Sequence, residues 1–171
     1  MLVGFGYDVH RLVSGRELYL GGVRVPYEKG LLGHSDADVL IHAVMDALLG
    51  AAGERDIGYH FPDTDPAYEG ISSLELLGKV SVLLEERGFR PHNVDSTVLA
   101  ERPKLAPYIP DMRRAMAAVL RLDTARVNVK ATTNEGLGFV GTGEGIAAYA
   151  VATLEEVTGA SGSIVGPPGP E

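Results

Sequence analysis

The sequence predicts an α+β fold built as a single domain. Its 171 residues are close to the usual domain size of about 150 residues. Strand-like and helix-like segments are mixed without the regular β–α–β alternation of a doubly wound parallel sheet. Hydrophobic residues make up 45% of the chain, which is ordinary for a globular protein. We place the domain over residues 1–159 and expect residues 160–171, which carry little apolar surface, to form a flexible C-terminal tail.

Three strands are expected near the N-terminus. Leu2–Val9 alternates large apolar residues with glycines, a pattern typical of a strand. The segments 17–20 and 23–26 flank Gly21-Gly22, which predicts a hairpin. Glycine is abundant, at 22 of 171 residues, and this indicates a backbone that approaches ligands or other chains closely.

One long helix is expected in the first half of the chain. Ala37–Ala52 is almost wholly apolar and long enough for a helix. Ser35 or Asp36 is expected to cap its N-terminus, because both side chains can accept a hydrogen bond from the first helical turn. The proline and the glycine of residues 63–70 predict a loop.

The second half of the chain mixes helices and strands. The expected elements are a helix from Ser72 or Ser73 to about Arg87, a strand over Asn93–Leu99, an amphipathic helix from Pro110 to Leu120 and a strand over 126–130. The last apolar segment, Ile146–Val157, fits both a helix and the alternation of a strand.

Charge and composition exclude several classes of protein. The chain has 15 Lys and Arg against 23 Asp and Glu, a net charge of −8 that argues against a nucleic-acid coat or binding to an anionic membrane. It has no cysteine, which excludes disulfides, iron–sulfur clusters and a cysteine nucleophile. No apolar run approaches the length of a membrane span, and the first residues do not resemble a secretory signal. We therefore expect a soluble cytoplasmic protein.

Two patterns together predict a metal site. Asp8 and His10 are two residues apart on the first strand and so point to the same face. Asp38, His42 and Asp46 form one stripe along the expected helix, and charges on so apolar a helix must be paired, bind a metal or line a cleft. Asp8, His10 and His42 supply two nitrogens and one oxygen with a fourth position open, the pattern of catalytic zinc. The plain alternatives are a solvent-facing strand end and a hydrogen-bonded core histidine.

Further polar segments could contact a phosphorylated ligand. His34 and Ser35 precede the expected helix, whose N-terminus suits an anion, although capping alone would also explain the serine. The acidic loops 56–58 and 61–65 could accept hydrogen bonds from sugar hydroxyls, or simply form turns. The segment 130–136 combines two threonines and a glutamate ahead of a glycine-dense run, which could bind phosphate and Mg²⁺.

In this combination and order the motifs resemble one family, the 2-C-methyl-D-erythritol 2,4-cyclodiphosphate synthases of the non-mevalonate isoprenoid pathway. The resemblance spans residues 3–157 and rests most on GYDVHRL at 6–12, HSDADVLIH at 34–42, DIG at 56–58 and FPDTDP at 61–66. It implies a homotrimer of subunits that each have a mixed sheet packed on one side by helices, with the sheets facing the threefold axis. It also implies that Ile146–Val157 is a strand and that active sites lie between adjacent subunits.

The resemblance implies the reaction of a phosphorus–oxygen lyase. In it, 4-diphosphocytidyl-2-C-methyl-D-erythritol 2-phosphate becomes 2-C-methyl-D-erythritol 2,4-cyclodiphosphate, and CMP leaves. Asp8, His10 and His42 are implied to hold Zn²⁺, and Glu135 to hold Mg²⁺ or Mn²⁺ with the substrate phosphates. His34 and Thr133 are implied to stabilise the transition state. The implied substrate-binding residues are Ser35, Asp56, Ile57, Gly58, Phe61, Asp63, Asp65, Ala100, Lys104, Leu105, Ala106, Ala131, Thr132, Thr133, Asn134, Glu135, Phe139 and Thr142.

Two parts of this set depend on neighbouring subunits. Residues 100–106 and 131–133 are implied to form the cytidine pocket next to the metal site of an adjacent subunit. Phe139 and Glu144 are implied to lie near a cavity on the threefold axis that could take an isoprenoid diphosphate. Some family members carry Arg where Thr142 stands here, and threonine supplies no charge for a diphosphate.

Two other functions stay open on the residues alone. One is a metal-dependent phosphohydrolase of a nucleotide-linked substrate, in which water would be activated at the open metal position. The other is a non-catalytic oligomer that binds metal and nucleotide. The sequence offers no clear second carboxylate cluster for a two-metal hydrolase, which counts against the first.

Overall fold

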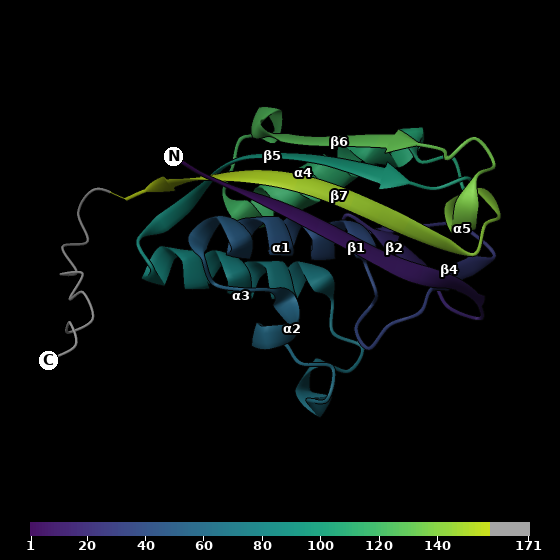
Figure 1. Ribbon diagram of the computed structural model, residues 1–171, viewed down its shortest axis with the longest axis horizontal. Helices are drawn as coiled ribbons and strands as arrows, with labels where there is room; N and C mark the ends of the chain where they lie inside the picture. The colour runs from purple at the N-terminus through teal and green to yellow at the C-terminus, as the bar shows by residue number, and fades with distance from the viewer. Residues whose placement is uncertain (158–171) are drawn as a thin grey trace, which may run out of the picture.

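The main sheet has five strands in the order β4-β1-β7-β5-β6 within the part of the chain that is described (Figure 1). The structure is a computed structural model and describes residues 1–157, so the tail expected over 160–171 lies outside the described residues. β5 and β6 are parallel and the other neighbouring pairs are antiparallel, which confirms a mixed sheet. A two-stranded sheet, β2-β3, forms the predicted hairpin. The strands are β1 (Leu2–Ser14), β2 (Leu18–Leu20), β3 (Val23–Val25), β4 (Lys29–Leu31), β5 (Phe89–Leu99), β6 (Val127–Thr132) and β7 (Gly145–Glu156).

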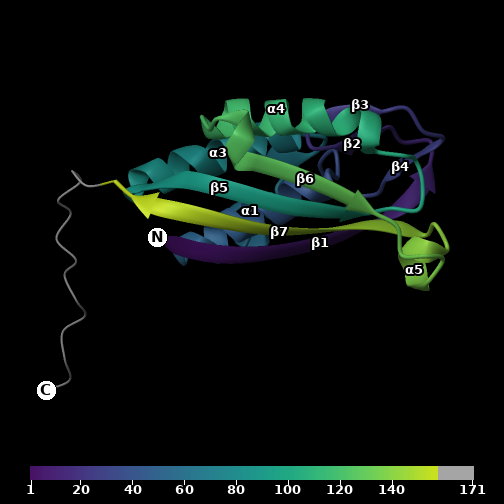
Figure 2. The same ribbon diagram turned by 90° about the horizontal axis from the view of Figure 1, so that it is seen from above.

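Three long helices cover one face of the main sheet. They are α1 (Val39–Ala52), α3 (Ser73–Glu86) and α4 (Ile109–Leu120). α1 contacts β1, β7 and β5, while α4 lies against β6. Figure 2 shows β1, β7, β5 and β6 side by side, with the short helix α5 at one end of the sheet. The shorter elements are α2 (Ile57–His60), α5 (Gly138–Gly141) and 3₁₀ turns at Pro66–Tyr68, Ala106–Tyr108 and Thr124–Arg126.

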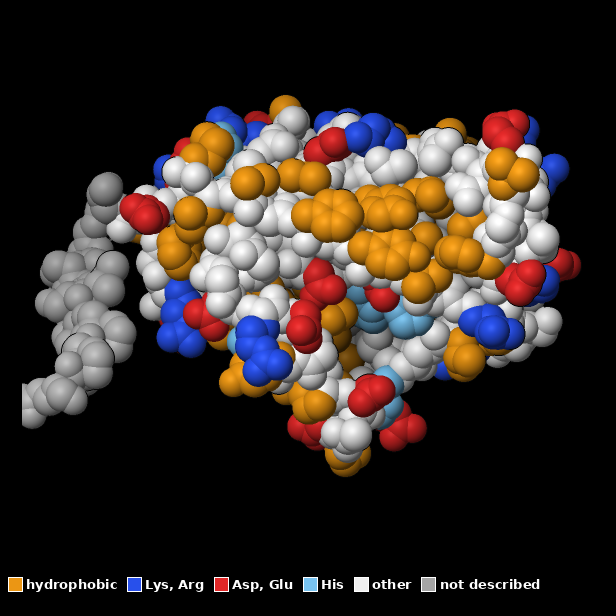
Figure 3. All heavy atoms as spheres, in the orientation of Figure 1, with side chains coloured by type: hydrophobic (Ala, Val, Ile, Leu, Met, Phe, Trp, Pro, Cys, Tyr) orange, Lys and Arg blue, Asp and Glu red, His pale blue; other side chains and the backbone are white. Residues whose placement is uncertain are grey.

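The other face of the sheet carries exposed apolar side chains. Phe5 and Tyr7 of β1 are 63% and 40% exposed, and their rings lie against Tyr149 of β7 with centroids 6.0 and 4.9 Å apart. Figure 3 shows apolar side chains gathered over β1 and β7, above a hollow edged by histidine. An exposed apolar patch of this kind marks an interaction surface. The homotrimer implied by the resemblance stays a prediction, since one chain is described.

Glycines on β1 let α1 pack directly against the strand. A Cβ atom added to Gly6 would lie 2.0 Å from the carbonyl oxygen of Ala43, and one added to Gly4 would lie 2.0 Å from that of Ala47. No side chain larger than hydrogen fits between the two backbones at either position. Gly4 and Gly6 point to the same face of β1 as Asp8 and so bring the next residues on that face close to α1. The close backbone approach expected from the glycine content is, at these positions, to the chain's own helix.

The N-terminus of α1 differs from the prediction. The capping residue is Asp38, and not Ser35 or Asp36, because the Asp38 carboxylate accepts a hydrogen bond from the Ile41 N–H at 3.1 Å. The same carboxylate accepts from the N–H groups of Gly21 and Gly22 at 2.9 and 2.7 Å. Asp38 is fully buried, and burial raises the pKa of its carboxyl although these hydrogen bonds oppose the rise. It therefore connects the β2-β3 turn to the helix and does not line a cleft with the other acidic residues of its stripe.

Most predicted elements are present with shifted ends. β1 continues past Val9 to Ser14, and β5 begins at Phe89, earlier than the expected Asn93. The segment left open between helix and strand forms β7, as the resemblance implies. α3 begins at Ser73 with Ser72 as its cap, as expected. The short elements β4, α2 and α5 were not predicted.

Among the described residues, no helix combines the length and the apolar character that crossing a membrane would require. The cytoplasmic location expected from the sequence stays a prediction.

Candidate metal centre and substrate site

Asp8, His10 and His42 meet around one point between β1 and α1. Asp8 Oδ2 lies 2.9 Å from His10 Nε2 and 3.0 Å from His42 Nδ1, and the two ring nitrogens are 3.2 Å apart. Ligands bound to tetrahedral zinc at about 2.0–2.1 Å lie about 3.3 Å from one another, so these three atoms fit a single ion. They form the one group of three such residues with metal-ligand spacing in the described part of the chain. We call this group the triad.

The packing of β1 on α1 builds the triad. Asp8 and His10 pair with Ala148 and Ile146 of β7, so their side chains are held at a fixed separation. His42 lies in the first half of α1, on the helix side that faces β1. The side chains are 23%, 18% and 10% exposed for Asp8, His10 and His42, so they are sheltered yet reachable from solvent.

Asp8 and His10 each shift the pKa of the other. Burial by itself would raise the pKa of the Asp8 carboxyl, but its hydrogen bonds to His10 and His42 and their charges outweigh burial and lower the pKa to about 2. Burial likewise opposes protonation of His10, but the hydrogen bond and charge of Asp8 and the carbonyl of Leu32 raise its pKa. Asp8 is therefore ionised at ordinary pH, the form in which a carboxylate can bind a cation.

The second ring nitrogen of each imidazole also has an oxygen partner. His10 Nδ1 lies 2.7 Å from the carbonyl oxygen of Leu32. His42 Nε2 lies 3.1 Å from Ser73 Oγ and 3.3 Å from Ser35 Oγ. Oxygen partners on the second nitrogen fix the orientation of a metal-binding histidine, as they do in known metal sites.

A hollow of about 420 Å³ opens beside the triad. Its lining contains many of the residues proposed from the sequence, namely Asp8, His10, His34, Ser35, His42, Ile57, Gly58, Phe61 and Asp63. Tyr68 and Leu76 also line it and were not proposed. The structure thus brings together three segments that are far apart in sequence, and it places a polar rim and an apolar wall next to the triad.

Two proposed aspartates hold the loops of this hollow. Asp56 caps α2 and accepts from the Tyr59 N–H at 2.9 Å. Asp65 accepts from the Ala67 N–H at 2.9 Å, and its carbonyl oxygen lies 3.1 Å from His34 Nε2. Neither residue is among those that line the hollow, which agrees with the turn-forming alternative for both carboxylates.

The residues proposed for cytidine line a separate hollow of about 260 Å³. It is formed by Ala100, Glu101, Pro103, Lys104, Leu105, Ala106, Ala131, Thr132 and Thr133. None of these residues lines the hollow beside the triad. Within one described chain, the candidate site is therefore divided between two hollows.

The loop after β6 holds the other proposed catalytic and metal-binding residues. Thr133 Oγ1 donates a hydrogen bond to Glu135 Oε1 at 2.9 Å. Glu135 has a left-handed backbone with φ of 52°, and Gly136 follows with φ of 78°. Glu101 Oε1 accepts from the N–H groups of Asn134 and Gly136 at 2.8 and 3.2 Å and so holds this loop in place. The role of Glu101 was not predicted, because its partners are more than 30 residues away in the sequence.

Phe139 and Thr142 lie at the end of the sheet near α5. Phe139 lines a third hollow of about 230 Å³ with Val9, Glu144 and Gly145. Thr142 Oγ1 donates to Glu144 Oε1 at 2.6 Å, so its hydroxyl is engaged within its own chain.

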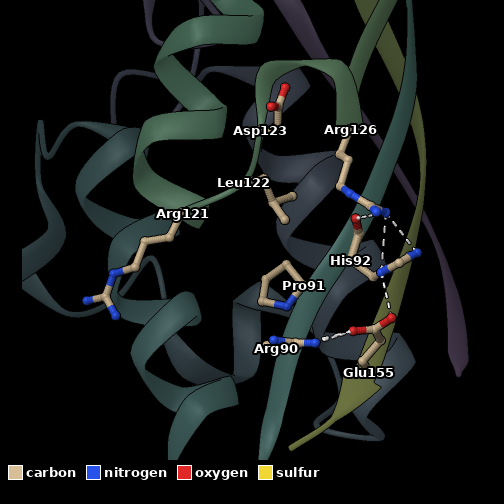
Figure 4. A pocket seen from close by; sticks show the side chains of 8 residues that line it. All are labelled: Arg90, Pro91, His92, Arg121, Leu122, Asp123, Arg126 and Glu155. Atoms are coloured by element: carbon tan, nitrogen blue, oxygen red, sulfur yellow. Dashed lines mark hydrogen bonds and ion pairs between the residues drawn. The ribbon is translucent and has the colours of Figure 1, made fainter.

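A hollow of about 340 Å³ at the other end of β5 is lined by charged side chains (Figure 4). Glu155 accepts from Arg90 Nη2 at 2.7 Å, and its other oxygen lies 2.7 Å from His92 Nδ1. Arg126 Nη1 contacts the His92 ring at 2.9 Å. Because its charges already contact one another, this hollow has weaker features of a ligand site than the one beside the triad.

The profile of the YgbB family matches residues 1–155 of the chain. A 2-C-methyl-D-erythritol 2,4-cyclodiphosphate synthase of Symbiobacterium thermophilum is 65% identical over 154 residues, which cover 90% of this chain and 98% of that protein. The bifunctional enzyme IspD/IspF of Desulforudis audaxviator is 64% identical over 157 residues, which cover 92% of this chain. The chain spans 40% of the length of that bifunctional relative. A solved structure of a 2C-methyl-D-erythritol-2,4-cyclodiphosphate synthase with bound CDP is similar at 38% identity and a TM-score of 0.82, covering 90% of this chain and 99% of that one.

Proposed function

The chain belongs to the YgbB family, and from this premise we propose that it catalyses the cyclodiphosphate-forming step of isoprenoid biosynthesis. The substrate in this proposal is 4-diphosphocytidyl-2-C-methyl-D-erythritol 2-phosphate, and the products are 2-C-methyl-D-erythritol 2,4-cyclodiphosphate and CMP. The observation that carries the proposal is the triad beside a hollow large enough for part of a nucleotide-linked substrate. This reaction makes the enzyme a phosphorus–oxygen lyase.

The proposed reaction needs no nucleophile from the protein. An oxygen of the substrate's 2-phosphate forms a bond to the β-phosphorus, and the bond from that phosphorus to the oxygen of CMP breaks, with the electron pair leaving on CMP. The protein has to bring the two phosphorus groups together, balance their negative charge and keep the reacting oxygen in line. Fixed side chains do this at lower cost than mobile ones, because less reorganisation is needed as charge moves.

Two cation sites are part of the proposal. A divalent cation at the triad would supply positive charge to the phosphate oxygens, and two imidazoles with one carboxylate suit Zn²⁺. Glu135 is proposed to hold Mg²⁺ or Mn²⁺ together with substrate phosphates, since carboxylate and phosphate oxygens are the ligands these ions prefer. His34, on the rim of the hollow, and Thr133 are proposed to donate hydrogen bonds to the phosphates in the transition state.

We further propose that the complete site forms between subunits of a homotrimer. The division of the candidate residues between two hollows of one chain supports this, because one substrate could then contact the triad of one subunit and residues 100–106 and 131–133 of another. The exposed apolar face of the sheet supports burial of that face in an assembly. The other substrate-binding residues that the resemblance implies are part of the same proposal.

Phosphorus-31 NMR of the purified protein with the diphosphocytidyl substrate and a divalent cation tests the proposed function. The expected result is a cyclic diphosphate and CMP in equal amounts. Inorganic phosphate or an open-chain product would instead support the phosphohydrolase. Bound metal and nucleotide without turnover would support the non-catalytic oligomer.

A further inference from the structure

The second nitrogen of His42 faces a buried chain of polar groups that the proposed reaction does not use. Nδ1 of this ring faces Asp8 and His10, and Nε2 faces Ser73 Oγ at 3.1 Å. Ser73 is fully buried as the first residue of α3, and it lies next to the triad without being part of it.

The hydroxyl of Ser73 has a defined direction. Its Oγ donates to Asp36 Oδ1 at 2.5 Å, and its backbone N–H donates to Asp36 Oδ2 at 2.9 Å. Both carboxylate oxygens of Asp36 are therefore occupied by the same residue. Because the hydroxyl proton is directed to Asp36, the remaining lone pairs of Ser73 Oγ can only accept a hydrogen bond from His42.

Ser35, the other hydroxyl near His42 Nε2, does not have this fixed direction. Its Oγ accepts from the Ala37 N–H at 3.1 Å and lies 3.3 Å from His42 Nε2, a longer separation than that of Ser73. With one hydrogen bond accepted from the backbone, the Ser35 hydroxyl proton can rotate toward or away from the ring. Of the two hydroxyls near Nε2, Ser73 is thus the one that is fixed as an acceptor.

We propose that Ser73 and Asp36 are positioning residues that keep the proton of His42 on Nε2 and leave the Nδ1 lone pair for a divalent cation. The hydrogen bonds run from His42 Nε2–H to Ser73 Oγ and from the Ser73 hydroxyl to the Asp36 carboxylate. This inference rests on the metal-binding part of the proposed function and adds two residues to it. This series of hydrogen bonds also connects the N-terminus of α3 to the loop before α1. The orientation of the His42 ring therefore depends on how these two helices pack.

Zinc titration of the whole protein against a competing chelating indicator tests the proposal. Partners of this kind behind a metal-binding histidine change metal affinity about 10–100-fold. We expect Ser73→Ala to raise the zinc Kd by about 10–100-fold. Asp36→Asn should raise the zinc Kd by a smaller factor, because the amide oxygen still accepts a hydrogen bond from one of the two Ser73 donors. The matched control is Ser81→Ala, a buried serine on the same helix that should bind zinc as the unaltered protein does.

Nitrogen-15 NMR of the His42 ring gives a readout that a merely structural role would not move. In the unaltered protein without zinc, the expected tautomer carries its proton on Nε2. A proton on Nδ1, or a Ser73→Ala variant with unchanged zinc Kd, would overturn the inference alone. Failure of the unaltered protein to bind zinc would overturn the proposed metal site and the inference with it. If Ser73→Ala does not fold, the tautomer of the unaltered protein and the Asp36→Asn titration still decide the question.

Discussion

The candidate site has two parts that are built in opposite ways. The triad lies on β1, which pairs with β7, and on the buried helix α1, and the partners of its rings are mostly buried or backbone groups. Thr133 and Glu135 lie in an exposed loop, which we call the β6 loop (residues 133–137). The Glu101 carboxylate connects this loop to a part of the chain more than 30 residues away. The first part is preorganised by the fold, whereas the second is shaped locally and leaves its side chains open to solvent. Mutations in the first part should therefore lower stability and metal affinity, whereas mutations in the second part should lower turnover.

The largest effect is expected from Gly6→Ala. The new methyl group would meet the Ala43 carbonyl oxygen at 2.0 Å, so β1 and α1 must move apart. We expect the free energy of unfolding, measured by urea denaturation, to fall by about 3 kcal/mol, the upper part of the range for overpacked cores. Zinc affinity should fall with it, because Asp8 and His42 lie on the two elements that separate.

Gly50→Ala is the matched control on α1. Its new Cβ would find its nearest neighbour, the Phe5 carbonyl oxygen, 3.9 Å away. Because alanine is the better helix former, this variant should gain up to about 1 kcal/mol of stability. Equal stability of the two variants would show that close backbone packing does not build the triad.

A smaller effect on stability, with a large effect on turnover, is expected from Glu101→Ala. The N–H groups of Asn134 and Gly136 lose their acceptor, which costs about 1 kcal/mol at a partly exposed site. Turnover should fall at least about tenfold if loss of Thr133 and Glu135 positioning raises the barrier by about 1.4 kcal/mol. Zinc binding at the triad should not change. Steady-state kinetics and zinc titration on the same preparation check both statements, and a matching loss of zinc would contradict the separation of the two parts.

The smallest effect concerns Asp46, which lies one helical turn beyond His42 and accepts from the Ile57 N–H at 2.9 Å. Burial raises the pKa of its carboxyl above 3.8, although this hydrogen bond opposes the rise. The folded protein therefore binds a proton more readily than the unfolded chain, so the ionised carboxylate lowers stability at neutral pH. Asp46→Asn keeps an oxygen for Ile57 and should be at least as stable as the unaltered protein at neutral pH.

The difference in stability between the unaltered protein and Asp46→Asn should depend on pH. As pH falls toward 3.8, the carboxyl of the unaltered protein is protonated in the folded state first, so its stability should rise relative to Asp46→Asn. Urea denaturation of both proteins at several pH values measures the difference. A stability advantage of Asn that grows on acidification would contradict the direction of the pKa shift.

The same division explains what the sequence could predict. The period of two on β1 and the period of 3.6 on α1 are local patterns, and they were enough to place Asp8, His10 and His42 on facing surfaces. The stripe left open whether Asp38 is paired, binds a metal or lines a cleft, because the Gly21 and Gly22 N–H groups that pair with it are brought to it only by the tertiary fold. Glu101 had no local signal for the same reason. α2 and α5 are four residues long each, too short to show a helical period.

Zinc K-edge X-ray absorption of the metal-loaded protein tests the central claim most directly. If Asp8, His10 and His42 share one ion, the spectrum will show one zinc per chain with two imidazole nitrogens and oxygen ligands at about 2.0–2.1 Å. The imidazole signal will be halved or the zinc lost altogether in His42→Ala. Zinc bound without imidazole, or an identical spectrum from the variant, would contradict the claim that these three side chains hold a common cation.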